Sequence, residues 1–476
     1  MASLEGEIAS IDTILAQIAQ RRVFVRRRIN GLSPTARIPS EILIEIFQIA
    51  CQPVDKGYRV RRAVTPLFIG SICRLWRDVA WSTPLLWNTI LLHVSPDRKH
   101  HDTQVQLLGD WLLNARSAPL SIKLIVEDER ESVLCAFEAI MRILITRSDY
   151  WLTFDSRLPP QCHNIFKNIN FPMLTSVSLQ LSNTVSTSII PDMFLTAPKL
   201  VDVNLLNCHF PLMLPWEQVR RFRTGLSSIT ECLKVLRESP NLQECYFNGV
   251  YTPVDFISKT IIPHAQLQLK HLHVMLQRHG PWTLSDSMSL FDGMTLPSLS
   301  NLCIQYYGTT ILHLSSITSL VLRSACNLER FTIKFPFDNA ELIPCLEAMP
   351  SLTYLDLEMP RGLDMGLTRH NVTSLDPLSN SSRLLLPNLK YLKYKGPVLC
   401  DCRTIVDMLA HRWHLSDDSR TSQGFTRVSK LQLAEILSTV PYLISADVQE
   451  ELKNLLEEGM SVRIESLVRT PATFNS

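Results

Sequence analysis

The central part of the chain is organised by a short pattern, Leu-x-x-Leu-x-Leu, in which other apolar residues replace some leucines. It recurs eight times, and the copies begin at Leu174, Leu200, Leu242, Leu269, Leu299, Leu328, Leu352 and Leu389. Successive copies start 24 to 42 residues apart, and most follow a Pro or an Asn. The end of each copy alternates as a half-buried strand does, and helical stretches such as "SSITECLKVLRES" separate the copies. One strand and one helix per repeat predict an α/β solenoid with parallel strands.

The expected solenoid spans residues 115–470 and is an irregular leucine-rich repeat, with strands on the concave side and helices on the convex side. "LSIKLIV" from residue 120 and "YWLTF" from 150 look like degenerate early repeats, while "VSKLQL" from 428 and "MSVRI" from 460 look like a closing cap. "ITSLVL" starts at residue 317, only 11 residues before the next copy, so we assign it to a helix. The alternative is a generic α/β domain with a parallel sheet.

A second apolar pattern marks residues 1–33. Steps of four and three residues join Leu4, Ile8, Ile11, Leu15, Ile18, Val25 and Ile29, with Arg22 at the one polar position. This heptad pattern predicts a helix with a narrow apolar seam. The helix either packs on the next domain or forms a coiled coil with a partner or a second copy. The basic run "RRVFVRRR" resembles a nuclear-import or nucleic-acid patch, but its alternation with seam residues favours a solvated flank.

Composition limits the class of protein. The 476 residues are 46% hydrophobic and 19% charged, which is typical of a folded protein with more than one structural unit. A net charge of +2 gives no bulk attraction to nucleic acid or an acidic membrane. Acidic residues in "MASLEGEIASIDTILAQ" exclude a secretory signal, and no apolar run is long enough to span a bilayer. The twelve cysteines lack paired spacings. We therefore expect an intracellular protein with reduced thiols, in the cytoplasm, the nucleus or both.

Two apolar blocks lie in residues 34–92. "RIPSEILIEIF" places Pro39 at a first helical position and Glu41 in the first turn, where a carboxylate is favoured. The second block, "LFIGSICRLWRDVAWSTPLLW", has helical spacing up to Pro84. Three short helices with this many large apolar groups cannot bury all of them. The segment is therefore expected to expose an apolar patch that binds another protein.

The two blocks together resemble the F-box, whose pattern is roughly L-P-x-E-[IL]-L-x-x-I-F, then V-C-[RK]-x-W-R-x-[IVL]-A, then L-W. Ile38 stands where Leu is usual, Ile72 where Val is usual, and the link over residues 50–66 is longer than in common members. The resemblance implies adaptor-binding roles for Ile38, Pro39, Glu41, Ile42, Leu43, Ile46, Phe47, Ile72, Cys73, Trp76, Arg77, Leu86 and Trp87. The order of seam helix, F-box and leucine-rich repeats is similar to large F-box families of mushroom-forming fungi.

The resemblance implies the substrate-recognition subunit of an SCF-type cullin–RING ubiquitin ligase. In that role the F-box binds a Skp-type adaptor and, through it, the cullin and the RING protein, while the repeats hold a target protein. Such a receptor acts by positioning, so no catalytic group and no cofactor is expected in this chain. The alternative is a leucine-rich-repeat scaffold for protein interactions outside any ubiquitin ligase.

The residues between the leucines face away from the core, and the last repeats carry Tyr together with charges of both signs. Tyr and Arg are enriched where proteins bind proteins. We therefore predict target contacts at Arg330, Lys334, Tyr354, Asp356, Glu358, Tyr391, Lys393 and Lys395. The alternative is a merely solvated concave face.

Metal and enzyme sites find little support in the sequence. Cys400, Cys402, His411 and His414 have the spacing C-x-C-x8-H-x2-H, whereas a zinc finger needs C-x2-4-C and H-x3-5-H. His271 and His273 share one strand face, but their strand supplies no third ligand. The chain has no G-x-S-x-G elbow and no glycine-rich phosphate loop. We therefore expect neither a bound metal nor catalysis.

Overall fold

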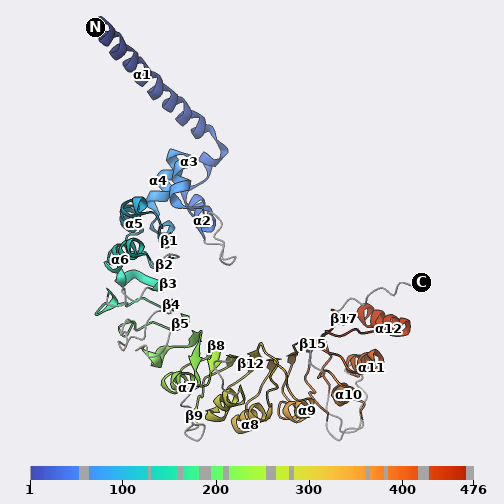
Figure 1. Cartoon of the computed structure of the whole chain (residues 1–476). Helices are drawn as coiled ribbons and strands as arrows, with labels where there is room; N and C mark the ends of the chain where they lie inside the picture. Colours follow the sequence, from blue (N-terminus) through green and yellow to red (C-terminus); the bar gives the residue numbers. More distant parts are fainter. Residues whose placement is uncertain are drawn as a thin grey trace, which may run out of the picture. The chain divides into compact units, whose positions relative to one another are not determined.

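The computed structural model describes residues 2–52, 64–126, 130–158, 165–181, 194–206, 214–253, 264–277, 284–360, 365–379, 384–415 and 428–467. Figure 1 shows the helices and strands of the chain with their labels. The chain divides into two compact units. The first comprises Met1–Ser176 with Thr196–Pro198, and the second comprises Val177–Leu195 with Lys199–Ser476. Among the described residues, no helix has the length and apolar character that a bilayer crossing requires.

The first unit begins with helices. They are α1 (Ala2–Leu32), α2 (Ser40–Cys51), α3 (Pro66–Ile72), α4 (Arg74–Ser82), α5 (His101–Ala115) and α6 (Glu131–Ile145), with short 3-10 turns at η1 (Pro34–Arg37) and η2 (Pro84–Leu86). The Thr65 hydroxyl accepts a hydrogen bond from the Phe68 backbone at 3.2 Å and so caps α3, with Pro66 at its first position. Local sequence thus fixes where this short helix starts.

Aromatic packing forms the core of the helices from α2 to α5. Phe47 is 2% exposed and lies against Trp76, with ring centroids 5.0 Å apart. Trp87 is 1% exposed, contacts the rings of Trp81 and Trp111, and donates from Nε1 to the Ala80 carbonyl at 2.8 Å. The Trp87 indole therefore supplies buried apolar area, and its N–H has the partner that burial requires.

Three parallel strands of the first unit alternate with its last two helices, α5 and α6. They are β1 (Thr89–His93), β2 (Leu120–Ile125) and β3 (Trp151–Leu158), paired in chain order. The strands β2 and β3 are the predicted early repeats. The strand β1 was not predicted, and it begins inside the range 34–92, which was expected to be helical. Its sequence, "TILLH", is a short apolar run without the leucine pattern, and such a run does not distinguish a strand from a helix end.

The second unit is built on parallel strands in chain order. They are β4 (Ser176–Leu181), β5 (Asp202–Leu206), β6 (Arg221–Thr224), β8 (Glu244–Tyr251), β10 (His271–Leu276), β12 (Asn301–Tyr306), β13 (Arg330–Lys334), β14 (Tyr354–Glu358), β15 (Tyr391–Gly396), β16 (Leu433–Ser438) and β17 (Ser461–Ser466). The two-residue strand β7 (Ser227–Ser228) pairs with β8, and β9 (His264–Ala265) pairs with β11 (Met294–Thr295). Each of the eight predicted copies has a strand beginning two residues after its first leucine.

Helices cover one face of these strands. They are α7 (Ile229–Glu238), α8 (Ser315–Ser324), α9 (Asn339–Glu347), α10 (Arg369–Leu375), α11 (Cys402–His414) and α12 (Ala446–Glu457). The helix α8 contains "ITSLVL", so its assignment to a helix is confirmed. Leu355 and Leu357 of β14 lie beside Leu342 of α9 and Val372 of α10. The pattern leucines therefore point to the helices, and the residues between them point to the opposite, open face of the strands.

The structure is thus an α/β fold with a long, parallel, unclosed arrangement of strands, as in a solenoid. Two strands of the second unit, β6 and β16, also differ from the expectation. The strand β6 was missed because Val219, Phe222 and Thr224 stand where the pattern has leucines, and this strand fills the longest gap between copies. The strand β16 starts at Leu433, because Leu431 and Ala434 are the buried positions rather than Val428.

A buried arginine holds α11 against the preceding chain. Arg412 is 0% exposed and donates to the carbonyls of Leu375 at 2.7 Å, Leu385 at 2.7 Å and Leu386 at 3.0 Å. Burial lowers the pKa of the guanidinium to about 10, and Asp376 opposes that shift. Leu386 has φ 51, a left-handed conformation that costs a leucine energy, and its carbonyl is one of the three acceptors.

We predict that Arg412→Met lowers the free energy of unfolding by roughly 3 kcal/mol or more, because three buried carbonyls lose their donor. Arg403 on the same helix is 53% exposed and ion-paired, so Arg403→Met is a matched control with an expected loss of about 1 kcal/mol or less. Urea unfolding followed by circular dichroism measures both. Equal losses in the two variants would contradict the assignment of Arg412 as a buried anchor.

Candidate functional site

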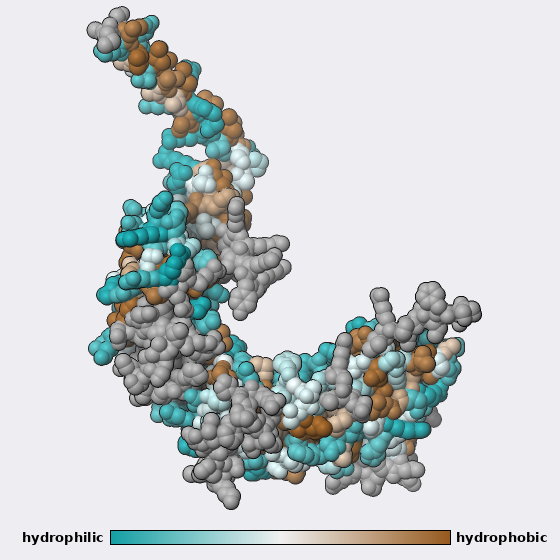
Figure 2. Space-filling view, viewed as in Figure 1, coloured by the Kyte–Doolittle hydropathy of each residue, from teal (hydrophilic) through white to brown (hydrophobic). Residues whose placement is uncertain are grey.

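The first candidate surface is an exposed group of large apolar side chains on the helices that follow α1. We call it the apolar face, and its members are Ile42, Ile46, Ile49, Leu67, Phe68, Ile72, Leu75 and Leu85. They are between 39% and 69% exposed, and hydrophobic surface is visible over these helices in Figure 2. A hydrophobic group of this size on the surface of a folded unit typically marks a binding site for a protein.

Helix geometry explains how α2 contributes to both the core and the apolar face. Leu43 and Phe47 are four residues apart and are 1% and 2% exposed, so one side of the helix belongs to the core. Ile42, Ile46 and Ile49 follow steps of four and three residues on an adjoining side, and they are 45% to 69% exposed. The helix is apolar on two sides, but the fold of this unit buries only one.

The thirteen residues that the sequence assigned to adaptor binding therefore have different positions. Leu43, Phe47, Leu86 and Trp87 are buried in the core, while Ile38, Cys73 and Trp76 are half-buried. Pro39, Glu41, Ile42, Ile46, Ile72 and Arg77 are exposed. The exposed group is available to a partner, whereas the buried group supports the helices that present it.

Two of these thirteen residues make local contacts that shape the helices. Cys73 lies at the start of α4, where its Sγ accepts a hydrogen bond from the Trp76 backbone at 3.5 Å. Arg77 donates from Nε to the Gly70 carbonyl at 2.8 Å and so joins α4 to α3. A Cβ atom on Gly70 would lie 2.1 Å from the Trp81 ring, so the ring occupies the space that a side chain at this position would need. These residues position the apolar face.

The second candidate surface is the open face of β13 to β17. Strand pairing aligns Lys334 with Glu358 and Lys395, and it aligns Asp356 with Lys393 and Glu435. All eight predicted target-contact residues lie on this face: Arg330 is exposed, and Lys334, Tyr354, Asp356, Glu358, Tyr391, Lys393 and Lys395 are half-buried. We call this group, together with Glu435, Arg463 and Glu465, the charged strand face.

The charges of this face pair with one another across the strands. Glu358 contacts the Nζ atoms of Lys395 at 2.5 Å and Lys334 at 3.3 Å. Glu435 contacts Lys393 and Arg463, both at 3.3 Å. Opposite charges on directly facing strand positions stabilise the pairing and fix long side chains in place. The charged strand face therefore carries ordered positive and negative side chains, and neither sign of charge dominates it.

Burial and neighbouring charges shift the two carboxylates of β14 in opposite directions. Partial burial raises the pKa of Asp356, and Lys334 and Lys393 only partly oppose that effect. Burial acts in the same direction on Glu358, but its hydrogen bond to Lys395 and the charges of Lys395 and Lys334 outweigh burial and lower its pKa. Glu358 is thus held as a charged group, while the charge on Asp356 is disfavoured.

Aromatic rings occupy the beginning of the same strands. The Arg330 guanidinium lies 3.9 Å from the centre of the Tyr354 ring, and the Tyr354 and Tyr391 rings are 6.2 Å apart. The Tyr391 hydroxyl donates to Gln432 Oε1 at 2.6 Å. Tyr and Arg supply large contact area with few rotatable bonds, which suits recognition of a folded protein or a peptide.

Sequence reasoning missed three members of the charged strand face, namely Glu435, Arg463 and Glu465. They lie on β16 and β17, in the segment that the sequence predicts to be a closing cap. The alternation in "LQLAEIL" contains the signal for Glu435, which stands between the buried residues Ala434 and Ile436. A pattern that starts at Val428 instead of Leu431 places Glu435 outside the repeat, and for this reason the sequence did not identify it.

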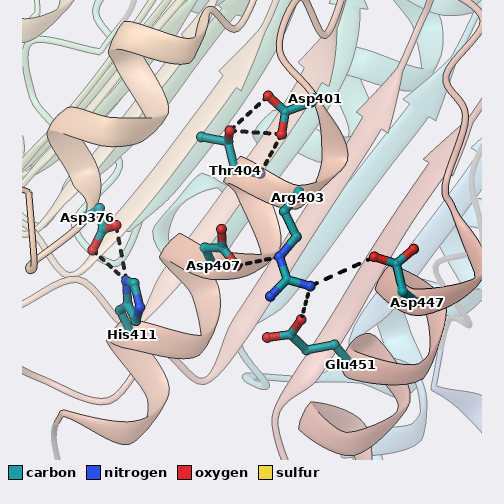
Figure 3. A network of polar contacts seen from close by, with 8 residues as sticks. All are labelled: Asp376, Asp401, Arg403, Thr404, Asp407, His411, Asp447 and Glu451. Atoms are coloured by element: carbon teal, nitrogen blue, oxygen red, sulfur yellow. Dashed lines mark hydrogen bonds and ion pairs between the residues drawn. The ribbon is translucent and has the colours of Figure 1, made fainter.

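Two of the residues considered as metal ligands, His411 and His414, contact carboxylates instead. His411 lies 3.0 Å from Asp376 (Figure 3), and His414 lies 2.9 Å from Glu458. Cys402 is buried at the start of α11, and burial raises the pKa of its thiol. His273 is half-buried on β10, where burial lowers its pKa. Within the described residues, no group of three or more His, Cys, Asp or Glu side chains has the arrangement of a metal site.

Comparison with known proteins does not assign the chain to a family. No family model matches the chain, and no curated protein matches it. A crystal structure of a protein from Bacteroides fragilis, solved by the Northeast Structural Genomics Consortium, is similar over 79% of this chain and 73% of its own. The two share 10% identity with a TM-score of 0.21, which is too low to support an argument about fold or function.

The opposite pKa shifts on β14 predict opposite effects of neutralising variants. Glu358→Gln should lower the free energy of unfolding at neutral pH by about 1 kcal/mol or less, because the pair is partly exposed. The lowered pKa of Glu358 stabilises the fold above its ordinary value of 4.5, and this stabilisation disappears as pH falls through the lower folded value.

Asp356→Asn should instead preserve or raise stability at neutral pH. The raised pKa of Asp356 means that its ionisation costs stability as pH rises from 3.8 through the folded value. Urea unfolding midpoints of both variants and the unmodified chain, measured from acidic to neutral pH, test the contrast. A loss of stability in Asp356→Asn equal to that in Glu358→Gln would refute it.

Proposed function

We propose that this chain is a non-catalytic substrate-recognition subunit of an SCF-type cullin–RING ubiquitin ligase that acts inside the cell. In this role, α2 to α4 form an F-box that binds a Skp-type adaptor. The repeat strands hold a target protein near the ubiquitin-charged enzyme. The receptor accelerates transfer by raising the local concentration of the target, so it needs no reactive side chain of its own.

The observation that carries this proposal is the apolar face. Its side chains are exposed although Phe47, Trp87 and the residues around them provide a well-packed core underneath. The exposure therefore does not result from a loosely folded unit. Apolar groups at the centre of an interface, surrounded by charged residues, are typical of stable protein complexes. The exposed ion pair of Arg74 and Asp78 on α4 belongs to such a polar rim.

The charged strand face is proposed to bind the target. Lys334, Lys393 and Lys395 are already paired with glutamates, so these side chains lose less conformational freedom on binding than unpaired side chains would. Because both signs are present in register, a target must match the order of charges and not merely carry net charge. Tyr354 and Tyr391 are proposed to give the apolar contact.

The adaptor proposal predicts that Ile46→Asp together with Ile72→Asp strongly weakens binding of a purified Skp-type adaptor. Both side chains are exposed, at 45% and 48%, so the core should remain intact while a charge enters the interface. We expect affinity to fall by roughly 30-fold or more, the effect of losing a hot spot of about 2 kcal/mol. Isothermal titration calorimetry measures this change.

The matched control is Leu113→Asp on α5, which replaces an equally apolar side chain that is 69% exposed outside the apolar face. Its affinity for the adaptor should stay within about twofold of the unmodified chain. Unchanged binding by the double variant would contradict the adaptor role. Binding of adaptor without recruitment of cullin would instead support a scaffold outside the ubiquitin system.

A further inference from the structure

The helix α1 exposes an apolar seam along its whole length. Its heptad residues are Leu4, Ile8, Ile11, Leu15, Ile18, Val25 and Ile29, and they are 48% to 64% exposed. Every residue from 4 to 32 is exposed, and hydrophobic surface recurs along the helix in Figure 2. An isolated helix of this kind gains little from its own hydrogen bonds, so its seam is suited to pairing with another helix.

The charges that flank the seam divide the helix into two halves. In the heptad register that places Leu4 at position d and Ile8 at position a, Glu5, Glu7 and Asp12 flank the seam of the first half at positions e and g. In the second half, the same positions hold Arg21, Arg26 and Arg28. Flanking charges at e and g determine the partner and the orientation of a coiled coil.

A parallel pair of two copies brings like charges together. In that arrangement a residue at g faces the residue at e five positions later in the other helix. Glu7 then faces Asp12, and Arg21 faces Arg26, so both contacts are repulsive. The seam itself also suffers, because Arg22 at position a meets the Arg22 of the other copy.

An antiparallel pair brings opposite charges together. Positions e then face e, and positions g face g, so Glu5 meets Arg26 and Glu7 meets Arg28, each twice by symmetry. Arg22 lies opposite Ile11 in the same register, and no two arginines share a seam layer. Apolar burial and charge thus agree on a single arrangement.

We infer that α1 pairs with α1 of a second copy of this chain as an antiparallel coiled coil. The chain is a homodimer held by this helix, independently of the proposed adaptor role. The ends of the two helices near Leu32 lie at opposite ends of a rod about 45 Å long, at 1.5 Å per residue. Each dimer therefore carries two binding units, which raises avidity for a target with two copies of the recognised surface.

The test is sedimentation equilibrium of the full chain and of two charge variants. Glu5→Arg with Glu7→Arg, and Arg26→Glu with Arg28→Glu, each place like charges opposite one another in the antiparallel pair. The dissociation constant of the dimer should rise by at least about tenfold in each variant. A mixture of the two variants should recover the affinity of the unmodified chain, because every flanking contact is then opposite in sign.

Salt and position controls make the result decisive. Raising the salt concentration should weaken the unmodified dimer, because it screens attractive contacts. Thr13→Arg and Arg27→Glu change charge at the outer position f and should leave the dissociation constant nearly unchanged. Ile11→Lys with Ile18→Lys places charges in the seam and should give a monomer.

Two results would overturn the inference. One is a monomer for the unmodified chain throughout the concentration range of the experiment. The other is a dimer that tightens in both charge variants. A parallel pair would tighten in this way, because the arginine introduced at position 7 would face Asp12 and the glutamate introduced at position 26 would face Arg21. Unchanged thermal unfolding of the remainder of the chain confirms that each variant is folded.

Discussion

The structure depends on the burial of alternate strand residues against a layer of helices. In β14, for example, Leu355 and Leu357 are at most 3% exposed, while Tyr354, Asp356 and Glu358 between them are half-buried on the open face. A shift of one residue would bring the charged residues into the core, so the register of each strand is strongly fixed. The apolar positions therefore also determine which charged residues meet on the opposite face.

This constraint explains how much of the repeat region was predictable. The first leucine of each copy fixes the start of a strand. Because that leucine is buried and the residues after it alternate between buried and exposed, only one strand register satisfies the pattern. The prediction was wrong for β6 and β16 because Val219, Phe222 and Ala434 fill core positions without being leucines. The helix side needs only an apolar residue of suitable size there, so a strict leucine pattern misses some strands.

The candidate surfaces were predictable in part. The sequence identifies apolar helices in residues 34–92, but it does not tell which of two neighbouring isoleucine and leucine residues is buried. Ile42 and Leu43 are 46% and 1% exposed, and this difference arises only when α4 and η2 pack on one side of α2. Similarly, single strands reveal which residues face outward, but the pairing of Lys393 with Glu435 follows from the alignment of β15 with β16.

The central proposal is that a Skp-type adaptor covers the apolar face, and hydrogen–deuterium exchange of the full chain with and without adaptor tests it most directly. Amides of α2, α3 and α4 should exchange more slowly in the complex, because a second protein then excludes water and suppresses local opening. Amides of β13 to β15 should be unaffected by the adaptor. Equal exchange of α2 to α4 in the presence and absence of bound adaptor would contradict the account.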